Sequence, residues 1–179
     1  VNGVIVAISI ADLLQQGETG RQAQAQAIRA RIQELHEQLG LAFPVYVIVT
    51  KSDLLAGFAE FFEGFGREER AQVWGMTFPL PADGTPQAAL ASFPAEFEAL
   101  ERQLQSRVLE RMQQERDLQR RALLYSFPQQ FAGVGDVLGR FLGTVFGPNR
   151  YEQPVLLRGV YFTSGTQEGS PIDRVMASL

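Results

Sequence analysis

Apolar runs alternate along this chain with longer stretches in which apolar residues keep helical spacing. Residues 4–10 and 45–49 form almost continuous apolar runs. Such runs are typical of strands buried on both faces, as in a parallel sheet. Between them, apolar residues recur at steps of three and four at Ile28, Ile32, Leu35 and Leu39. The pattern predicts a βαβ unit in which strands 4–10 and 45–50 are parallel and joined by a right-handed crossover through a helix over 19–39.

The ends of this helix carry capping signals. Thr19 and Gln22 have the spacing of a capping box at a helix N-terminus. Gly40 suits the left-handed position just past the last turn. Asp12 is placed to cap a shorter helical turn after the first strand. His36 lies at the edge of the apolar stripe, and we expect a half-buried surface histidine rather than a ligand.

The chain after the second strand is expected to be mostly helical. Residues 54–65 place apolar side chains on one broad face interrupted by Gly57, which we interpret as a core-packing helix rather than a ligand site. Residues 73–79 return to apolar character and are expected to anchor this segment. The longest predicted helix runs from about residue 92 to about residue 124, because apolar residues keep 3.6-residue spacing there.

Arginines gather near the end of that long predicted helix. Arg116, Arg120 and Arg121 would lie in its C-terminal part, where the helix dipole favours cations. The alternative is a patch that binds an acidic partner or lipid headgroups.

A further helix is predicted to begin with Asp136 as its N-cap. Glycines recur every four residues at Gly135, Gly139, Gly143 and Gly147. Such a row of small residues permits close helix packing, and the segment is too short to span a bilayer. A third strand is predicted at 155–162, followed by a polar turn and a last helix that begins near Pro171.

Composition narrows the class of protein. Of 179 residues, 45% are apolar, which is enough for a core and argues against disorder. A net charge of −4 and a pI near 5.1 argue against general nucleic-acid binding. With no cysteine and one histidine, thiolate metal sites, disulfides and histidine clusters are excluded. No signal peptide or membrane-spanning run is recognisable, and the start inside an apparent buried strand suggests a piece of a longer protein.

Two polar loops follow two of the predicted strands. Thr50, Lys51 and Asp53 come directly after the second strand, and Thr163, Ser164 and Gly165 follow the third. In parallel α/β sheets, ligands bind beyond the carboxyl ends of the strands. We therefore expect the two loops to lie side by side. The alternative for Asp53 is an N-cap of the helix that follows.

The first loop resembles the base-reading [NT]-K-x-D motif of P-loop GTPases, and the second occupies the place of their [ST]-A-[KL]-like motif. The resemblance implies that Asp53 accepts hydrogen bonds from guanine, that the stem of Lys51 lies along the base, and that backbone N–H groups near Ser164 meet it. The implied fold is α/β: the C-terminal half of a GTPase-like parallel sheet with a large helical insertion. Residues 1–55 would form the βαβ part, 56–152 a mostly helical inserted subdomain, and 153–179 the last strand and helix.

A longer set of ordered blocks resembles the IcmF/TssM family, an inner-membrane component of bacterial type VI secretion systems. The blocks are NGVIV (2–6), ADLL (11–14), FPVYV (43–47), TKSDLLAGF (50–58), QVWGMTFP (72–79) and RGVYFTSGTQEG (158–169). They span nearly the whole chain. The resemblance implies a GTPase-like domain at the cytoplasmic face of the inner membrane, with TssL, the lipoprotein TssJ and baseplate components as partners.

Phosphate-binding residues are missing from this sequence. Nothing matches G-x-x-x-x-G-K-[ST], whose backbone amides and lysine hold the phosphates. The chain alone is expected to be inactive, since phosphoryl transfer depends on groups around the phosphates and magnesium. GTP or ATP with Mg²⁺ would be cofactors of the longer protein only.

Three functions therefore remain open. The chain is a structural part of a secretion membrane complex, the C-terminal half of an active GTP or ATP hydrolase, or a helical adaptor unrelated to nucleotides. The first is favoured.

Overall fold

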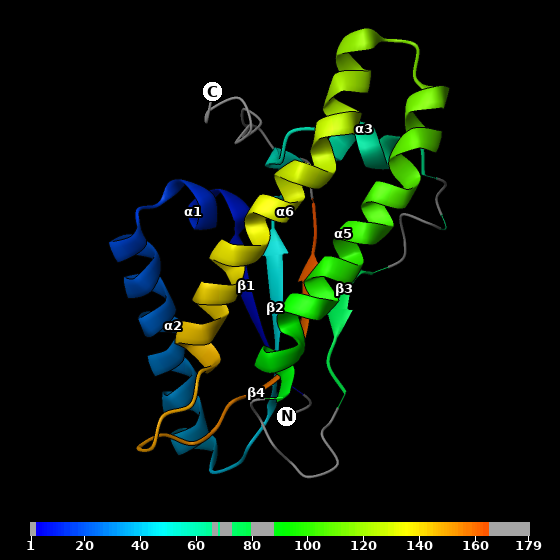
Figure 1. Cartoon of the computed structure of the whole chain (residues 1–179). Coiled ribbons are helices and arrows are strands. Elements are labelled where there is room, and N and C mark those ends of the chain that lie inside the picture. Colours follow the sequence, from blue (N-terminus) through cyan, green and yellow to red (C-terminus); the bar gives the residue numbers. More distant parts are fainter. Residues whose placement is uncertain (1–2, 66–67, 69–72, 80–87, 165–179) are drawn as a thin grey trace.

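Four strands form a single sheet in the computed structural model, which describes residues 3–65, 68, 73–79 and 88–164. The strands are β1 (Val4–Ser9), β2 (Pro44–Thr50), β3 (Trp74–Thr77) and β4 (Leu156–Phe162), in the order β1-β2-β4-β3. The first, second and fourth are parallel, and β3 pairs with β4 in the antiparallel direction. The predicted α/β class with a mostly parallel sheet is therefore confirmed (Figure 1).

The predicted βαβ unit is also confirmed. Between β1 and β2 lie α1 (Ile10–Gln15) and α2 (Glu18–Leu39). The two strands stay in parallel register from the pair Val4 and Val45 to the pair Ser9 and Thr50.

The caps of these helices differ in part from the prediction. Gly40 ends α2 with φ of 65°, as expected for a left-handed C-cap. At the other end, the N-cap is Gly17 and makes no side-chain cap bond, so Thr19 lies inside the helix and forms no capping box. Ser9, rather than Asp12, caps α1, because its hydroxyl accepts a hydrogen bond from the N–H of Asp12 at 3.5 Å.

The prediction of one long helix over about 92–124 is wrong, because the chain turns back between residues 114 and 118. α5 (Ala88–Gln114) ends before Arg116, and α6 (Leu118–Phe146) begins after Asp117. The Asp117 carboxylate caps α6 by accepting hydrogen bonds from the N–H groups of Gln119 and Arg120 at 2.8 and 3.0 Å. α5 and α6 therefore form a hairpin whose helices pack on each other (Figure 1).

α6 continues through the position where a new helix was predicted. Asp136 lies in its interior and is not an N-cap. Two glycines of the predicted row contact α5. A Cβ atom at Gly135 would lie 2.8 Å from the ring of Phe97, and one at Gly139 would lie 3.4 Å from the ring of Phe93. Small residues at these two positions allow the close packing that the row predicted.

The helix after β2 is shorter than the one predicted over residues 54–65. A 3-10 turn, η1 (Ser52–Leu54), precedes α3 (Phe58–Glu63). Between them Gly57 has φ of 86°, and a Cβ atom there would lie 2.4 Å from the carbonyl oxygen of Leu123 on α6. Only glycine fits this close approach without strain.

The middle of the chain takes part in the same sheet and core as its two ends. Within the described part of 56–152, β3 adds a strand next to β4, and α6 contacts both α2 and α3. The proposed division into 1–55, 56–152 and 153–179 stays a prediction. The helix predicted from Pro171 lies outside the described residues.

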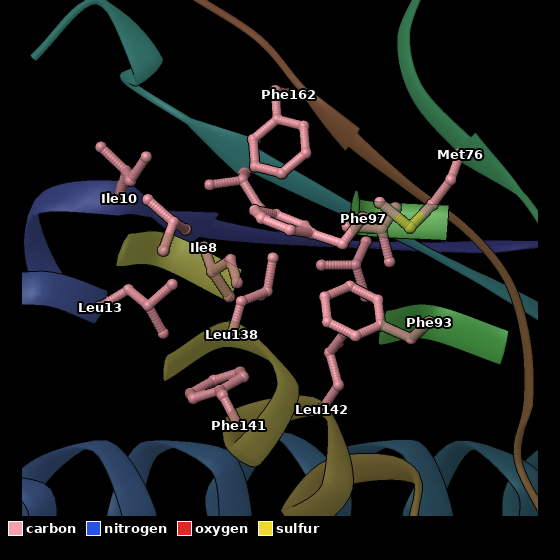
Figure 2. Close-up of a cluster of buried hydrophobic side chains, with 14 of the residues drawn as sticks. Ile8, Ile10, Leu13, Met76, Phe93, Phe97, Leu138, Phe141, Leu142 and Phe162 are labelled. Carbon is pink, nitrogen blue, oxygen red and sulfur yellow. The ribbon is translucent and has the colours of Figure 1, made fainter. Parts of the chain in front are cut away.

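One face of the sheet carries the core. Val45, Val47 and Val49 point to this face and are at most 1% exposed. Helices α2, α5 and α6 lie over it (Figure 1), and Figure 2 shows side chains of α5 and α6, such as Phe97 and Leu138, gathered with those of the strands.

The opposite face, which we call the second face, is less covered than predicted. Ile5 is 64% exposed, and Ala7 is exposed as well. In the register, these residues pair with Tyr46 and Ile48 of β2, which are half-buried. Among the described residues, β1 is therefore not buried on both faces as predicted, because the three long helices lie together on the first face.

His36 is more deeply buried than predicted. It lies in the last turn of α2, is 1% exposed, and its ring centroid is 4.3 Å from that of Phe43. Neither ring nitrogen has a hydrogen-bond partner among the described residues, and burial lowers the pKa of the imidazole. The side chain acts as an apolar core group.

Candidate functional site

The two polar loops lie side by side at the carboxyl edge of the parallel strands. β2 and β4 are neighbours in the sheet, so the loops that follow them leave from the same edge. The N–H of Ser52 donates to the carbonyl oxygen of Thr163 at 3.1 Å, and the N–H of Thr163 donates to the carbonyl oxygen of Val49 at 2.9 Å. The expected juxtaposition of the loops is therefore confirmed.

Thr50 and Lys51 differ in what they offer at this edge. The Thr50 hydroxyl donates to the carbonyl oxygen of Ile8 at 3.2 Å, so it ties β2 to β1. Lys51 is exposed and has φ of 60°, the only positive φ of a non-glycine residue in the described ranges. It is also the only lysine in the sequence. Strained backbone conformations often occur where a residue contacts a ligand. Lys51 combines such a conformation with an exposed ammonium group at the carboxyl end of β2.

The carboxylate of Asp53 has one oxygen that lacks a hydrogen-bond donor among the described residues. One oxygen of its carboxylate, Oδ1, is shielded from solvent and has no hydrogen-bond partner in the part of the chain that the structure describes. Asp53 lies within η1, whose N-cap is Lys51, so the alternative of an N-capping Asp53 is wrong. A shielded carboxylate oxygen without a donor is costly unless a ligand or water supplies one.

Ser52 occupies the variable position x of the [NT]-K-x-D motif. It is 0% exposed, and its hydroxyl donates to the carbonyl oxygen of Val49 at 3.3 Å. With its backbone bond to Thr163, it fixes the loop between Lys51 and Asp53. This serine is not among the predicted site residues, because nothing in the sequence marks it.

The second loop is described only in part. Thr163 and Ser164 are exposed, and their place next to Ser52 is set by the backbone bonds. Gly165 lies outside the described residues. The structure thus brings together five of the six predicted site residues: Thr50, Lys51, Asp53, Thr163 and Ser164.

Arg116, Arg120 and Arg121 lie around the N-terminal end of α6. The prediction that they lie at the C-terminal end of a helix is therefore wrong. Arg120 pairs with Glu115 at 2.8 Å and with Glu63. Its hydrogen bonds to Glu115 and then Glu63 raise the pKa of the guanidinium. This arginine is used within the fold, where it links α6 to α3, rather than presented to a partner.

Other features of the described residues lie away from this edge. A cavity of about 310 Å³ between α2 and α6 is lined by Arg21 and Arg140 among others, and by none of the loop residues. Within the described ranges, no group of three or more acidic or histidine side chains is placed to hold a metal. No helix there is both long enough and apolar enough to cross a bilayer.

Comparison with known proteins shows the family of this chain. The family described as the IcmF-related N-terminal domain matches residues 1–179. The type VI secretion system component TssM1 of Pseudomonas aeruginosa is 58% identical over 179 residues, which is all of this chain and 16% of that protein. No solved structure matches the chain. This chain therefore belongs to the IcmF-related family and corresponds to its N-terminal domain.

Proposed function

We propose that this chain is an assembly domain of a type VI secretion component. The observation that carries this proposal is the 58% identity to a protein named as such a component, which extends over the entire chain. Because the chain spans only 16% of that relative, the activity and partners of the whole protein are part of the proposal.

The fold that we propose for this domain is GTPase-like. The support is the βαβ unit followed by a third parallel strand, in the order β1-β2-β4, with polar loops at the shared carboxyl edge. Ligands of open α/β sheets bind at such an edge. Fold alone does not decide function, so the site residues must carry the rest.

A nucleotide base is the ligand that fits the loop chemistry best. Asp53 has a shielded, unpartnered oxygen that can accept from the N–H groups of guanine. Lys51 stands next to it on an exposed, left-handed backbone, from which its aliphatic stem can cover the face of a base. Thr50, Thr163, Ser164 and Gly165 would complete this base pocket.

Hydrolysis is the second candidate. In that case the chain is the C-terminal half of a GTP or ATP hydrolase, and residues elsewhere in the longer protein bind the phosphates and Mg²⁺. The sequence supplies no G-x-x-x-x-G-K-[ST] motif for them. We therefore propose that the domain supports assembly whether or not nucleotide turns over.

The place of action that we propose is the cytoplasmic face of the bacterial inner membrane. The partners would be other type VI secretion proteins, among them TssL, TssJ and baseplate components. These proposals rest on membership of the family and on the relative's name.

The test uses the longer protein with Asp53→Asn, and Asp136→Asn as the matched control on the exposed surface of α6. A fluorescent GTP analogue measures binding, and co-purification with other type VI proteins measures assembly. We expect Asp53→Asn to weaken GTP binding at least tenfold and to leave assembly unchanged. The new amide should favour xanthosine triphosphate, because its NH₂ can donate to the carbonyl that replaces the guanine amino group.

Each part of the proposal can fail separately. Unchanged preference for GTP over xanthosine triphosphate would refute the base pocket alone. A wild-type protein that co-purifies with no type VI component would refute the assembly role. Loss of hydrolysis, assembly and secretion together in Asp53→Asn, but not in Asp136→Asn, would favour the hydrolase.

A further inference from the structure

The α5–α6 hairpin extends past the carboxyl edge of the sheet, and its end carries exposed apolar side chains. We call residues 105–125 the hairpin end. Leu109 on α5 is 72% exposed, and Leu118 on α6 is 77% exposed. Tyr125 is exposed as well. α3 lies against one side of the hairpin end (Figure 1).

The exposed leucine of α5 points away from α3. Arg111 Nε donates to the carbonyl oxygen of Phe61 at 3.0 Å, and the Arg107 guanidinium lies 5.5 Å from the centre of the Phe65 ring. Both arginines therefore reach the α3 side. Leu109 stands midway between them in the sequence, about 200° around the helix from each. It consequently lies on the opposite side of α5.

The same relation holds on α6. Leu123 and Phe127 approach Gly57 at the start of α3. Tyr125 stands midway between these two residues, so it points away from α3. Leu118 is seven residues before Tyr125, which is two helical turns, and shares its side of α6. The hairpin end thus has one apolar face that is opposite α3.

Cationic side chains accompany this face. The hairpin end contains five arginines and three carboxylates, although the net charge of the chain is −4. Two of the carboxylates are used locally, because Glu115 pairs with Arg120 and Asp117 caps α6. The side chains of Arg116 and Arg121 form no ion pair or hydrogen bond with any residue that the structure describes. Two guanidinium groups therefore remain without a counter-charge.

One of these arginines lies among the apolar side chains. Arg121 is three residues after Leu118 and four before Tyr125, and residues at these spacings are neighbours on a helix surface. An arginine in this position can extend its aliphatic stem along apolar surface and place its guanidinium in a polar layer. Tyrosine and leucine beside arginine are typical of helices that lie at a membrane surface.

We propose that the hairpin end contacts the surface of an anionic lipid bilayer. Leu109, Leu118 and Tyr125 enter the interface, while Arg116 and Arg121 bind lipid phosphates, whose geometry suits a guanidinium. This inference rests on the proposed location at the inner membrane. A bilayer fits such a projecting end because lipids move to accommodate separate leucines, whereas a protein would need a matching pocket for each.

The test uses the full 179-residue chain, which has no cysteine. Ala122→Cys lies on the exposed side of α6 between Leu118 and Tyr125 and carries an environment-sensitive nitrobenzoxadiazole label. Tyr151→Cys carries the same label as a control, since Tyr151 is exposed and follows the other end of α6. Vesicles of phosphatidylethanolamine and phosphatidylglycerol supply an anionic surface, and vesicles of phosphatidylcholine supply a neutral one.

The two labels should respond differently to the anionic vesicles. We expect the emission of the label at Ala122→Cys to brighten and move to shorter wavelength, and the emission at Tyr151→Cys to stay unchanged. Neutral vesicles and added salt should weaken the response, because the arginines act through screened charge. An unchanged spectrum at Ala122→Cys, or an equal response at both labels, would overturn the proposal.

A pair of charge variants tests the arginines. Arg116→Gln with Arg121→Gln should lower the affinity for anionic vesicles at least about tenfold, since each arginine at an anionic surface adds to binding. The control is Arg31→Gln with Arg150→Gln, which removes the same net charge from exposed positions elsewhere. Equal losses in the two pairs would contradict a specific role of the hairpin end.

A further variant tests the apolar contact. Leu109→Gln with Leu118→Gln keeps the net charge and should abolish the spectral response at Ala122→Cys. A full response in this variant would contradict insertion of the leucines. Circular dichroism verifies that every variant folds, which is expected because the substituted side chains are exposed or half-buried.

The outcome for this inference is separate from the outcome for the proposed function. Asp53→Asn should bind vesicles as the original chain does, so failure of the base pocket leaves the membrane contact standing. A lack of vesicle binding overturns the membrane contact alone. If Arg116→Gln with Arg121→Gln in the longer protein then also loses co-purification with other type VI proteins, the hairpin end binds an acidic protein instead.

Discussion

The N–H of Ser52 donates a hydrogen bond to the carbonyl oxygen of Thr163, across two loops that lie far apart in the sequence. With the return bond from Thr163 to Val49, it continues the pairing of β2 and β4 past the ends of both strands. Backbone hydrogen bonds thus hold the loops that carry Asp53 and Ser164 against each other. A ligand would meet a preformed edge and would not have to order it.

Lys51→Gly should stabilise the fold. Lysine at φ of 60° has a Cβ that crowds the backbone, at a cost of about 1–2 kcal/mol relative to the right-handed region. We expect the glycine variant to raise the free energy of unfolding by about 1 kcal/mol, after allowance for the greater freedom of its unfolded chain. Urea unfolding measures the change. Lys51→Gln keeps the Cβ and should show no gain, and a loss of stability in Lys51→Gly would contradict the strain.

Gly57→Ala should have the opposite effect. The new Cβ would lie 2.4 Å from the carbonyl oxygen of Leu123, and φ of 86° is itself unfavourable for alanine. We expect a loss of at least about 2 kcal/mol, since backbone strain alone costs about 1–3 kcal/mol. The control is Gly143→Ala, in the same helix as Leu123, where no atom lies within 4 Å of the new methyl group. That variant should gain about 0.5–1 kcal/mol of stability.

Phe61→Ala tests whether the aromatic face of α3 belongs to the core. Phe61 is 0% exposed and its ring centroid lies 5.2 Å from that of Phe127 on α6. Chemical denaturation should show a loss of about 3–5 kcal/mol, the usual range for such a truncation. Tyr125→Ala is the comparison, because Tyr125 is 66% exposed and its loss should stay within about 0.5 kcal/mol. A loss below about 1 kcal/mol for Phe61→Ala would mark that face as a partner surface.

His36 should make the stability depend on pH. Burial lowers the pKa of its imidazole in the folded chain below the ordinary value of 6.5. Below pH 6.5 the unfolded chain therefore binds a proton that the folded chain does not, and the free energy of unfolding falls as the pH decreases. The slope can reach about 1.4 kcal/mol per pH unit until the pH passes the folded pKa.

The measurement is urea unfolding between pH 5.5 and about 7.5, a window above the ordinary pKa of the carboxylates. His36→Phe keeps a ring beside Phe43 and removes the only histidine. Its stability should be nearly constant in this window. An equal slope in both proteins would assign the effect to another group.

Sequence patterns predicted the elements whose signals are local. The apolar run before Thr50 marked β2, and the polar residues after it marked the edge where Asp53 lies. Gly40 marked the end of α2, because a left-handed C-cap suits glycine whatever packs against it.

The sequence patterns gave wrong helix boundaries where tertiary contacts determine them. The chain turns back at Asp117 without a glycine or proline, so nothing broke the helical spacing around it. α6 then continues through Pro128, which ordinarily interrupts a helix. Phe127 and Phe131 beside it are 0% exposed, and their packing offsets the lost hydrogen bond. At the site, the shielded oxygen of Asp53 depends on neighbours that no spacing rule specifies.

The position of β1 has a consequence for handling residues 1–179 as an isolated chain. This strand is the first in the sheet order, and its six residues, VIVAIS, include neither a charge nor a proline. On its outer side no described strand is paired with it. Backbone groups on such an edge are a template for any extended chain that approaches, including another molecule of the same protein. Concentrated solutions of residues 1–179 alone should therefore become turbid through edge-to-edge growth, and Ile5→Lys should keep them clear.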